Sequence, residues 1–105
     1  SQLQPDAPVV DAYDGKRVKI PGFVVPLEGT ETLTTEFLLV PYFGACIHVP
    51  PPPSNQIVYV KFEKGIPIDN IYDAIWVTGT LSTDGWQGDI ASVGYRLSGE
   101  SIQMF

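Results

Sequence analysis

The sequence predicts an all-β domain, a small OB-fold-like five-stranded barrel with one short helix. Short apolar or alternating segments recur along the 105 residues, and Gly, Pro or Asp-Gly turn signals separate them. The 10 Gly and 10 Pro exclude a long helical bundle, because Pro costs about 3 kcal/mol in a helix interior. A content of 44% hydrophobic and 17% charged residues indicates a packed core rather than a disordered chain.

The chain is expected to divide into a short lead-in and one barrel. Residues 1–14, SQLQPDAPVVDAYD, are interrupted by Pro and Asp and predict an extended lead-in. Residues 15–105 then have the length of a single β-barrel domain that buries an ordinary core without disulfides.

The first strand is expected to be long and bent. Apolar and basic residues alternate from residue 16 to residue 27, which is typical of a half-buried strand. Pro21-Gly22 interrupts the alternation and predicts a bulge or bend. Glu28-Gly29-Thr30 is expected to end this strand.

Two further strands precede the predicted helix. Residues 36–40, EFLLV, form a continuous apolar run that favours a buried strand, and Pro41 ends it. Residues 41–56 are a long loop. Residues 57–62 alternate again, and Lys64-Gly65 predicts the next turn.

The last third of the chain predicts the helix and the remaining strands. Apolar residues at helical spacing over residues 68–76, with Asp69 as N-cap, indicate one or two helical turns. Residues 75–82, IWVTGTLS, are rich in β-branched residues and predict a strand. Residues 90–97 predict another strand, and residues 102–105 a short final one. A helix after the third strand and a long first strand are features of the OB-fold.

Charge and composition exclude several classes of function. Twelve acidic and six basic residues give a net charge of -6, so we expect no binding to nucleic acid, which needs clustered cations. No apolar run approaches the roughly 20 residues of a membrane span. The first residues lack the basic and apolar regions of a signal peptide, and the residues alone do not separate a cytosolic protein from a processed mature chain.

The chemistry of the chain is concentrated in one segment, FGACIHVPPPPSNQ. The single Cys and the single His, Cys46 and His48, are two positions apart and project to the same side of an extended backbone. Thiolate and imidazole ligands suit zinc or copper. The remaining ligands would be Asp, Glu, water or a group from another chain, with Glu28, Glu31 and Glu36 as candidates. Such an open site fits metal transfer better than a structural role.

The residues around this pair are expected to hold it in place. The four consecutive prolines favour a polyproline II conformation, which keeps its shape without help from a sheet. Gly44 permits a tight turn before the pair, and the amides of Asn55 and Gln56 can cap the loop or support the ligands. The predicted supporting residues are Gly44, Pro50, Pro51, Pro52, Pro53, Asn55 and Gln56.

Two other interpretations of the same segment remain open. Cys46 and His48 can be packing residues in an ordered crossover, with the proline run and nearby aromatic rings docking a partner protein. Alternatively, His48 activates Cys46 as a nucleophile, although no oxyanion hole can be identified in the sequence.

Trp86 is a separate candidate. It lies in the loop between the last two strands, which together with the loop after the first strand lines the ligand-binding face of many OB-folds. Trp86 is either a stacking platform for a ligand or a cover over the mouth of the barrel.

The segment resembles a bacterial family of domains of unknown function. The residues that carry the resemblance are GACIHVPPPPSNQIVYV, preceded by GFVVPLE and EFLLVPYF and followed by IWVTGTL. Cys46, His48, the prolines from Pro50 to Pro53, Asn55 and Gln56 all match the family signature. The resemblance covers roughly residues 15–98.

The resemblance implies a setting and partners rather than a reaction. Members of that family are exported proteins of Gram-negative bacteria, often lipoproteins, so we expect a periplasmic protein that contacts the membrane only through a lipid anchor. An ABC transporter resembling macrolide exporters, or a periplasmic metal-binding protein under zinc-responsive control, is the expected partner. No enzymatic activity follows, and the expected role is zinc binding in metal homeostasis or transporter-linked export.

Overall fold

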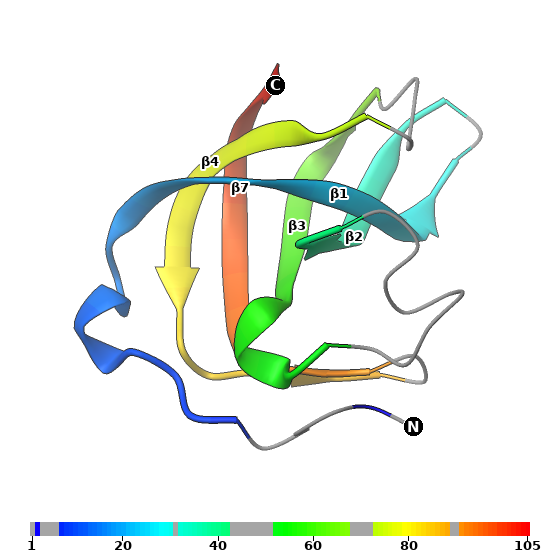
Figure 1. Ribbon diagram of the computed structural model, residues 1–105. Helices are drawn as coiled ribbons and strands as arrows, with labels where there is room; N and C mark the ends of the chain where they lie inside the picture. The colour runs from blue at the N-terminus through cyan, green and yellow to red at the C-terminus, as the bar shows by residue number, and fades with distance from the viewer. Residues whose placement is uncertain (1, 3–6, 31, 43–51, 68–72, 89–90) are drawn as a thin grey trace.

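The computed structural model describes residues 2, 7–30, 32–42, 52–67, 73–88 and 91–105, which form a closed five-stranded barrel (Figure 1). The strand order is β1-β2-β3-β7-β4, and β1 closes the barrel by pairing with β4. Strands β3 and β7 are parallel, and the other neighbours are antiparallel. The predicted five-stranded barrel is therefore confirmed. Its strands are β1 (Arg17–Gly29), β2 (Thr34–Val40), β3 (Val58–Ile66), β4 (Ile75–Ser82) and β7 (Tyr95–Met104).

Strand β1 is long because it serves two neighbours in succession. Residues 17–22 pair with β4, and residues 23–29 pair with β2. Gly22 lies at the change of partner, where an added Cβ would be 2.8 Å from the side chain of Leu39. The register shifts of β1 occur between Pro26 and Gly29 instead, so of the bulge or bend predicted at Pro21-Gly22 the bulge is wrong, and a change of partner lies there.

The barrel interior is filled by apolar side chains from all five strands. The rings of Phe37 and Phe62 stack at its centre with their centroids 6.1 Å apart. Removal of this apolar surface from water is the main driving force for closing the sheet. The buried interior residues are Val24, Phe37, Leu39, Val58, Val60, Phe62, Ile75, Val77, Leu81 and Leu97.

A second apolar layer lies outside the barrel. The two-stranded sheet of β5 (Trp86–Gln87) and β6 (Ser92–Val93) packs on the outer face of β1, β2 and β3. Residues 37–40 of β2 are therefore buried on both faces, which explains their continuous apolar run. The buried residues of this outer layer are Val25, Leu38, Val40, Ile57, Tyr59, Ala91 and Val93.

Helical structure in the described residues is limited to two 3-10 turns, η1 (Asp11–Tyr13) and η2 (Ser54–Gln56). The helix predicted over residues 68–76 lies partly outside the described residues, because 68–72 are not among them. Ile75 and Trp76, where the helical spacing overlaps the strand predicted over residues 75–82, begin β4 and pair with β1 and β7. No described helix is long and apolar enough to cross a membrane.

The end of the chain differs from the predicted pair of strands. The segment predicted as one strand over residues 90–97 is divided at Gly94, between β6 and β7. An added Cβ at Gly94 would lie 2.6 Å from the side chain of Val9, so the lead-in packs closely there. Residues 102–104 are not a separate strand but the end of β7, and Phe105 lies beyond it.

Candidate functional site

The predicted site lies in the connection between β2 and β3. Cys46 and His48, together with Gly44, Pro50 and Pro51, fall within residues 43–51, which lie outside the described residues. The structure describes both ends of this connection, from Val40 to Tyr42 on one side and from Pro52 onward on the other.

The exit from the proline run is fixed by Gln2 of the lead-in. Pro52 is fully buried, and its carbonyl accepts a hydrogen bond from Gln2 Nε2 at 3.1 Å. Gln2 Nε2 also donates to the carbonyl of Ser92 at 2.6 Å, and Gln2 Oε1 accepts from the backbone N–H of Ser92 at 2.7 Å. One amide side chain thus joins the lead-in, the proline run and β6.

The 3-10 turn η2, which follows the proline run, is also hydrogen-bonded to the lead-in and to Gly94. Ser54 is buried to 2% exposure, and its carbonyl accepts from the backbone N–H of Gly94 at 2.8 Å. Asn55 Nδ2 donates to the carbonyl of Pro8 at 3.0 Å, so its amide binds the lead-in. Gln56 is exposed on the same turn. Figure 1 shows the lead-in running past η2 and the β5–β6 hairpin at one end of the barrel.

Sequence reasoning missed Gln2, whose side chain binds the proline run and β6, and Ser54, whose buried carbonyl accepts from Gly94. A polar residue in a lead-in has no periodic pattern that could reveal a distant partner. The only available signal for Ser54 was its position directly after four prolines, where the turn begins.

The described residues do not by themselves provide a metal site. Within them, no group of three or more His, Cys, Asp and Glu side chains lies close enough to hold an ion. Among the acidic candidates, Glu36 accepts a hydrogen bond from the Tyr59 hydroxyl, whereas Glu31 lies outside the described residues.

Trp86 lies on the outer layer and packs against the protein. Its indole stacks on the ring of Tyr59, with centroids 4.8 Å apart and planes 11° apart. The hairpin that carries Trp86 covers the outer face of β2 and β3, which is the usual ligand-binding face of an OB-fold. In this protein, that face is occupied by the chain itself.

Tyr59 is the most perturbed titratable group among those described. Its pKa is raised to about 12, mainly by burial and further by the hydrogen bond to Glu36 and the charge of that carboxylate. The guanidinium of Arg96, 5.8 Å from the ring centroid, acts in the opposite direction. The phenol is thus held in its neutral form as a hydrogen-bond donor.

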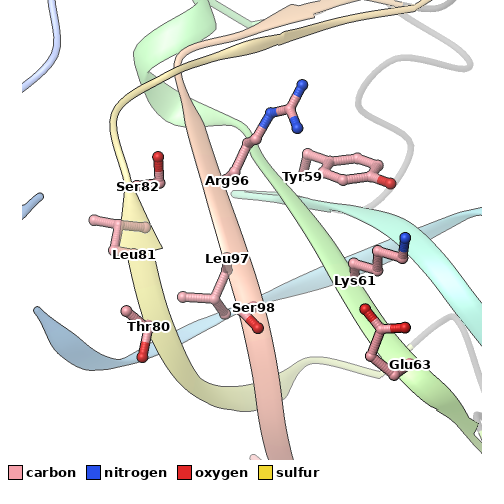
Figure 2. A pocket seen from close by; sticks show the side chains of 9 residues that line it. All are labelled: Tyr59, Lys61, Glu63, Thr80, Leu81, Ser82, Arg96, Leu97 and Ser98. Carbon is pink, nitrogen blue, oxygen red and sulfur yellow. The ribbon is translucent and has the colours of Figure 1, made fainter. Parts of the chain in front are cut away.

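A groove that sequence reasoning did not find lies next to Tyr59 (Figure 2). It is a hollow of about 270 Å³ on the outside of β3, β7 and β4. No local signal could have revealed it, because its residues come from three strands that are far apart in the sequence. The lining residues are Tyr59, Lys61, Glu63, Thr80, Leu81, Ser82, Arg96, Leu97 and Ser98.

Comparison with known proteins identifies relatives for this arrangement. Residues 1–104 match the family described as "Protein of unknown function (DUF3299)". The fold is similar to the crystal structure of a DUF3299 family protein (PA4066) from Pseudomonas aeruginosa PAO1, with a TM-score of 0.93 and 53% sequence identity. That similarity covers 99% of this chain and 70% of the other chain. No curated protein matches the sequence. The chain therefore belongs to the DUF3299 family.

Proposed function

We propose that this protein is a non-catalytic binding protein in which Cys46 and His48 ligate one transition-metal ion, with zinc the expected metal. The supporting sequence feature is the spacing of the single Cys and the single His, which stand two positions apart. Thiolate and imidazole are ligands that zinc prefers.

The observation that carries the proposal is the firm attachment of both ends of the connection. Val40 is buried at the end of β2, and Pro52 and Ser54 are buried at the other end. Hydrogen bonds from Gln2 and Gly94 hold that second end against the lead-in and β6. Fixing the ends of a binding segment in advance lowers the entropy lost when a ligand binds.

The proposed site is incomplete in protein ligands. Cys46 and His48 supply two ligands, and the described residues offer no cluster that would complete a closed four-ligand site. Water, an acidic side chain or a group from another chain would fill the remaining positions. A site with exchangeable positions suits delivery of a metal better than permanent structural binding.

Calorimetric titration of the reduced protein with Zn²⁺ tests this proposal. We expect one ion per chain, or one per two chains if a second copy supplies ligands. Cys46→Ser and His48→Ala should each weaken binding at least about tenfold, since losses of that size follow even from changes around a metal ligand. Gln56→Ala, an exposed residue of the adjacent turn, is the control and should bind as the parent protein does.

Cobalt(II) gives an independent readout. A thiolate ligand adds a charge-transfer band to the cobalt spectrum, and Cys46→Ser should abolish that band. Absence of zinc binding, or equal affinity in Cys46→Ser, His48→Ala and the parent protein, would overturn the proposal.

The proposed setting is the periplasm, where the protein would serve metal homeostasis or export linked to an ABC transporter. The support is the resemblance of the segment around Cys46 to exported, often lipid-anchored proteins. Osmotic-shock fractionation of cells that make the natural protein is the direct test. Recovery of the protein in the cytosolic fraction alone would contradict this setting.

The alternative role, docking of a partner protein on the proline run, receives less support from the structure. Pro52 is fully buried and Pro53 is half-buried, so these two rings contact their own chain. A protein that binds no metal, yet loses a partner when Tyr42, which is exposed beside the loop, is changed to Ala, would favour this alternative.

A further inference from the structure

The groove outside β3, β7 and β4 combines basic and hydroxyl side chains in a regular grid. Strand pairing places Tyr59 beside Arg96 and Arg96 beside Ser82, while the next row places Lys61 beside Ser98 and Ser98 beside Thr80. All six side chains point outward, because the alternating residues Val60, Leu81 and Leu97 point into the barrel. Figure 2 shows these side chains around one hollow.

Arg96 is held in one orientation by two contacts. Its Nε donates to the carbonyl of Gly85 at 2.6 Å, and its guanidinium carbon lies 5.8 Å from the centroid of the Tyr59 ring. Within the described part of the chain, no acceptor bonds to its two terminal nitrogens. These nitrogens remain available to an oxyanion, which the planar guanidinium binds with two parallel hydrogen bonds.

Lys61 is the second cation of the groove. The residue paired with Lys61 on β2 is Glu36, and the carboxylate of Glu36 accepts a hydrogen bond from the Tyr59 hydroxyl. Among the described residues, Lys61 forms no ion pair. Lys61 and Arg96 thus place two cations on adjacent strands of the groove, beside the carboxylates of Glu63 in its lining and of Glu36 on β2.

We propose that this groove binds a small oxyanion that also carries hydroxyl groups, such as a sugar phosphate or a hydroxy acid. Lys61 and the terminal nitrogens of Arg96 bind the anionic group. Thr80 and Ser98 face the ligand hydroxyls, and Glu63 at the edge of the groove disfavours more highly charged anions. The volume of about 270 Å³ suits a ligand of one sugar ring.

Backbone amide NMR titration at low ionic strength tests this proposal. The probes are inorganic phosphate, glucose 6-phosphate and, as the uncharged comparison, glucose. We expect saturable shifts confined to β3, the end of β4 and the start of β7, with tighter binding of glucose 6-phosphate than of phosphate and no shifts with glucose. Low salt is needed because the exposed cations are screened at higher ionic strength.

Matched variants separate the groove from the overall charge. Lys61→Gln and Arg96→Gln should each weaken binding of glucose 6-phosphate about tenfold, the loss expected for a hydrogen bond to a charged group. Lys64→Gln removes the same charge from the same strand outside the groove and should leave the affinity within about twofold, because exposed charges interact weakly. The spectra of all variants also show whether the fold is kept.

Several outcomes would overturn the proposal. These are an absence of shifts with both anions, shifts dispersed over all basic residues, or an equal loss of affinity in Lys64→Gln. Binding of glucose as tight as that of glucose 6-phosphate would also contradict an anion site. Cys46→Ser should bind the anions normally, which keeps this test separate from the test of metal binding.

Discussion

The two outer faces of the barrel differ in what covers them. The outer face of β1, β2 and the start of β3 is apolar and is buried beneath the β5–β6 hairpin. The outer face of β4 and β7 carries hydroxyl and charged side chains and is open to solvent. A continuous apolar run thus marks a strand covered on both faces, whereas alternation marks a strand with one open face.

Strand β3 crosses from one of these environments to the other. Its first residues, Val58 to Val60, are all buried because the outer layer covers them. Beyond them, exposed Lys61 and Glu63 alternate with buried Phe62, and their side chains line the groove. Tyr59 marks the boundary, since its ring packs under Trp86 while its edge also lines the groove.

The largest expected effect compares two adjacent leucines of β2. Leu38 points into the outer layer and Leu39 into the barrel, and they are 0% and 2% exposed. Leu38→Ala and Leu39→Ala should each lower the free energy of unfolding by about 2–5 kcal/mol, because each leaves a cavity in a packed layer. Urea unfolding followed by circular dichroism measures both values.

The exposed Leu33 provides the matched control for this pair. Leu33→Ala should cost less than about 1 kcal/mol. If Leu38→Ala costs no more than this control while Leu39→Ala costs several times more, the hairpin is not packed on the outer face and the comparison fails.

An intermediate effect is expected from the titration of Tyr59. Its pKa of about 12 lies above the usual value of 10.0, so the folded protein keeps the phenol proton at pH values where the unfolded chain loses it. The stabilisation is complete below pH 10 and is lost as the pH rises toward 12, at about 1.4 kcal/mol per pKa unit. Absorbance titration of tyrosinate should show one of the five tyrosines ionising late.

Tyr59→Phe should remove that late transition and flatten the decrease in stability above pH 10. Glu36→Gln removes a charge and alters a hydrogen bond that raise the pKa, so it should shift the transition to lower pH. If Tyr59 titrates together with the exposed tyrosines, this residue lies on the open face. Tyr59 would then not mark the boundary between the covered and the open part of β3.

The smallest expected effect concerns the open face alone. Arg17 Nε lies 3.0 Å from Glu100 Oε1, and the two side chains are 70% and 42% exposed. Glu100→Gln should change the free energy of unfolding by less than about 1 kcal/mol, because solvent screens an exposed ion pair. Urea unfolding at low and high salt measures the difference, and a loss as large as that of Leu38→Ala would show that this face is not as open as described.

Strand positions could be predicted from the sequence wherever burial alone decides the pattern. The apolar run EFLLV and the β-branched run IWVTGTLS both became strands, as expected. Two predictions overlapped at Ile75 and Trp76, which have helical spacing but also begin the predicted strand, and pairing with two neighbouring strands holds them in β4. Gly22 likewise marks a change of partner that no local pattern contains.

Of the two candidate sites, one could be predicted from local sequence and the other could not. The Cys46–His48 pair could be found by sequence reasoning because its members are two residues apart, and zinc binding there stays a prediction. The groove could not be found, because Lys61, Arg96 and Thr80 become neighbours only through strand pairing. The role of Gln2 could not be predicted for the same reason, since its hydrogen-bond partners lie in the proline run and in β6.

The sequence by itself determined that the chain is a β-barrel with a proline-rich segment carrying its single Cys and His. Local composition sets these features, because φ restriction by Pro and burial of alternating apolar residues act over a few positions. Only the tertiary structure decided that the β5–β6 hairpin covers the outer face of β2 and that Gln2 of the lead-in binds the proline run. It also decided that Lys61 and Arg96 line the same groove. Those features depend on the register between distant strands, which is set by the free energy of the whole fold rather than by any one segment.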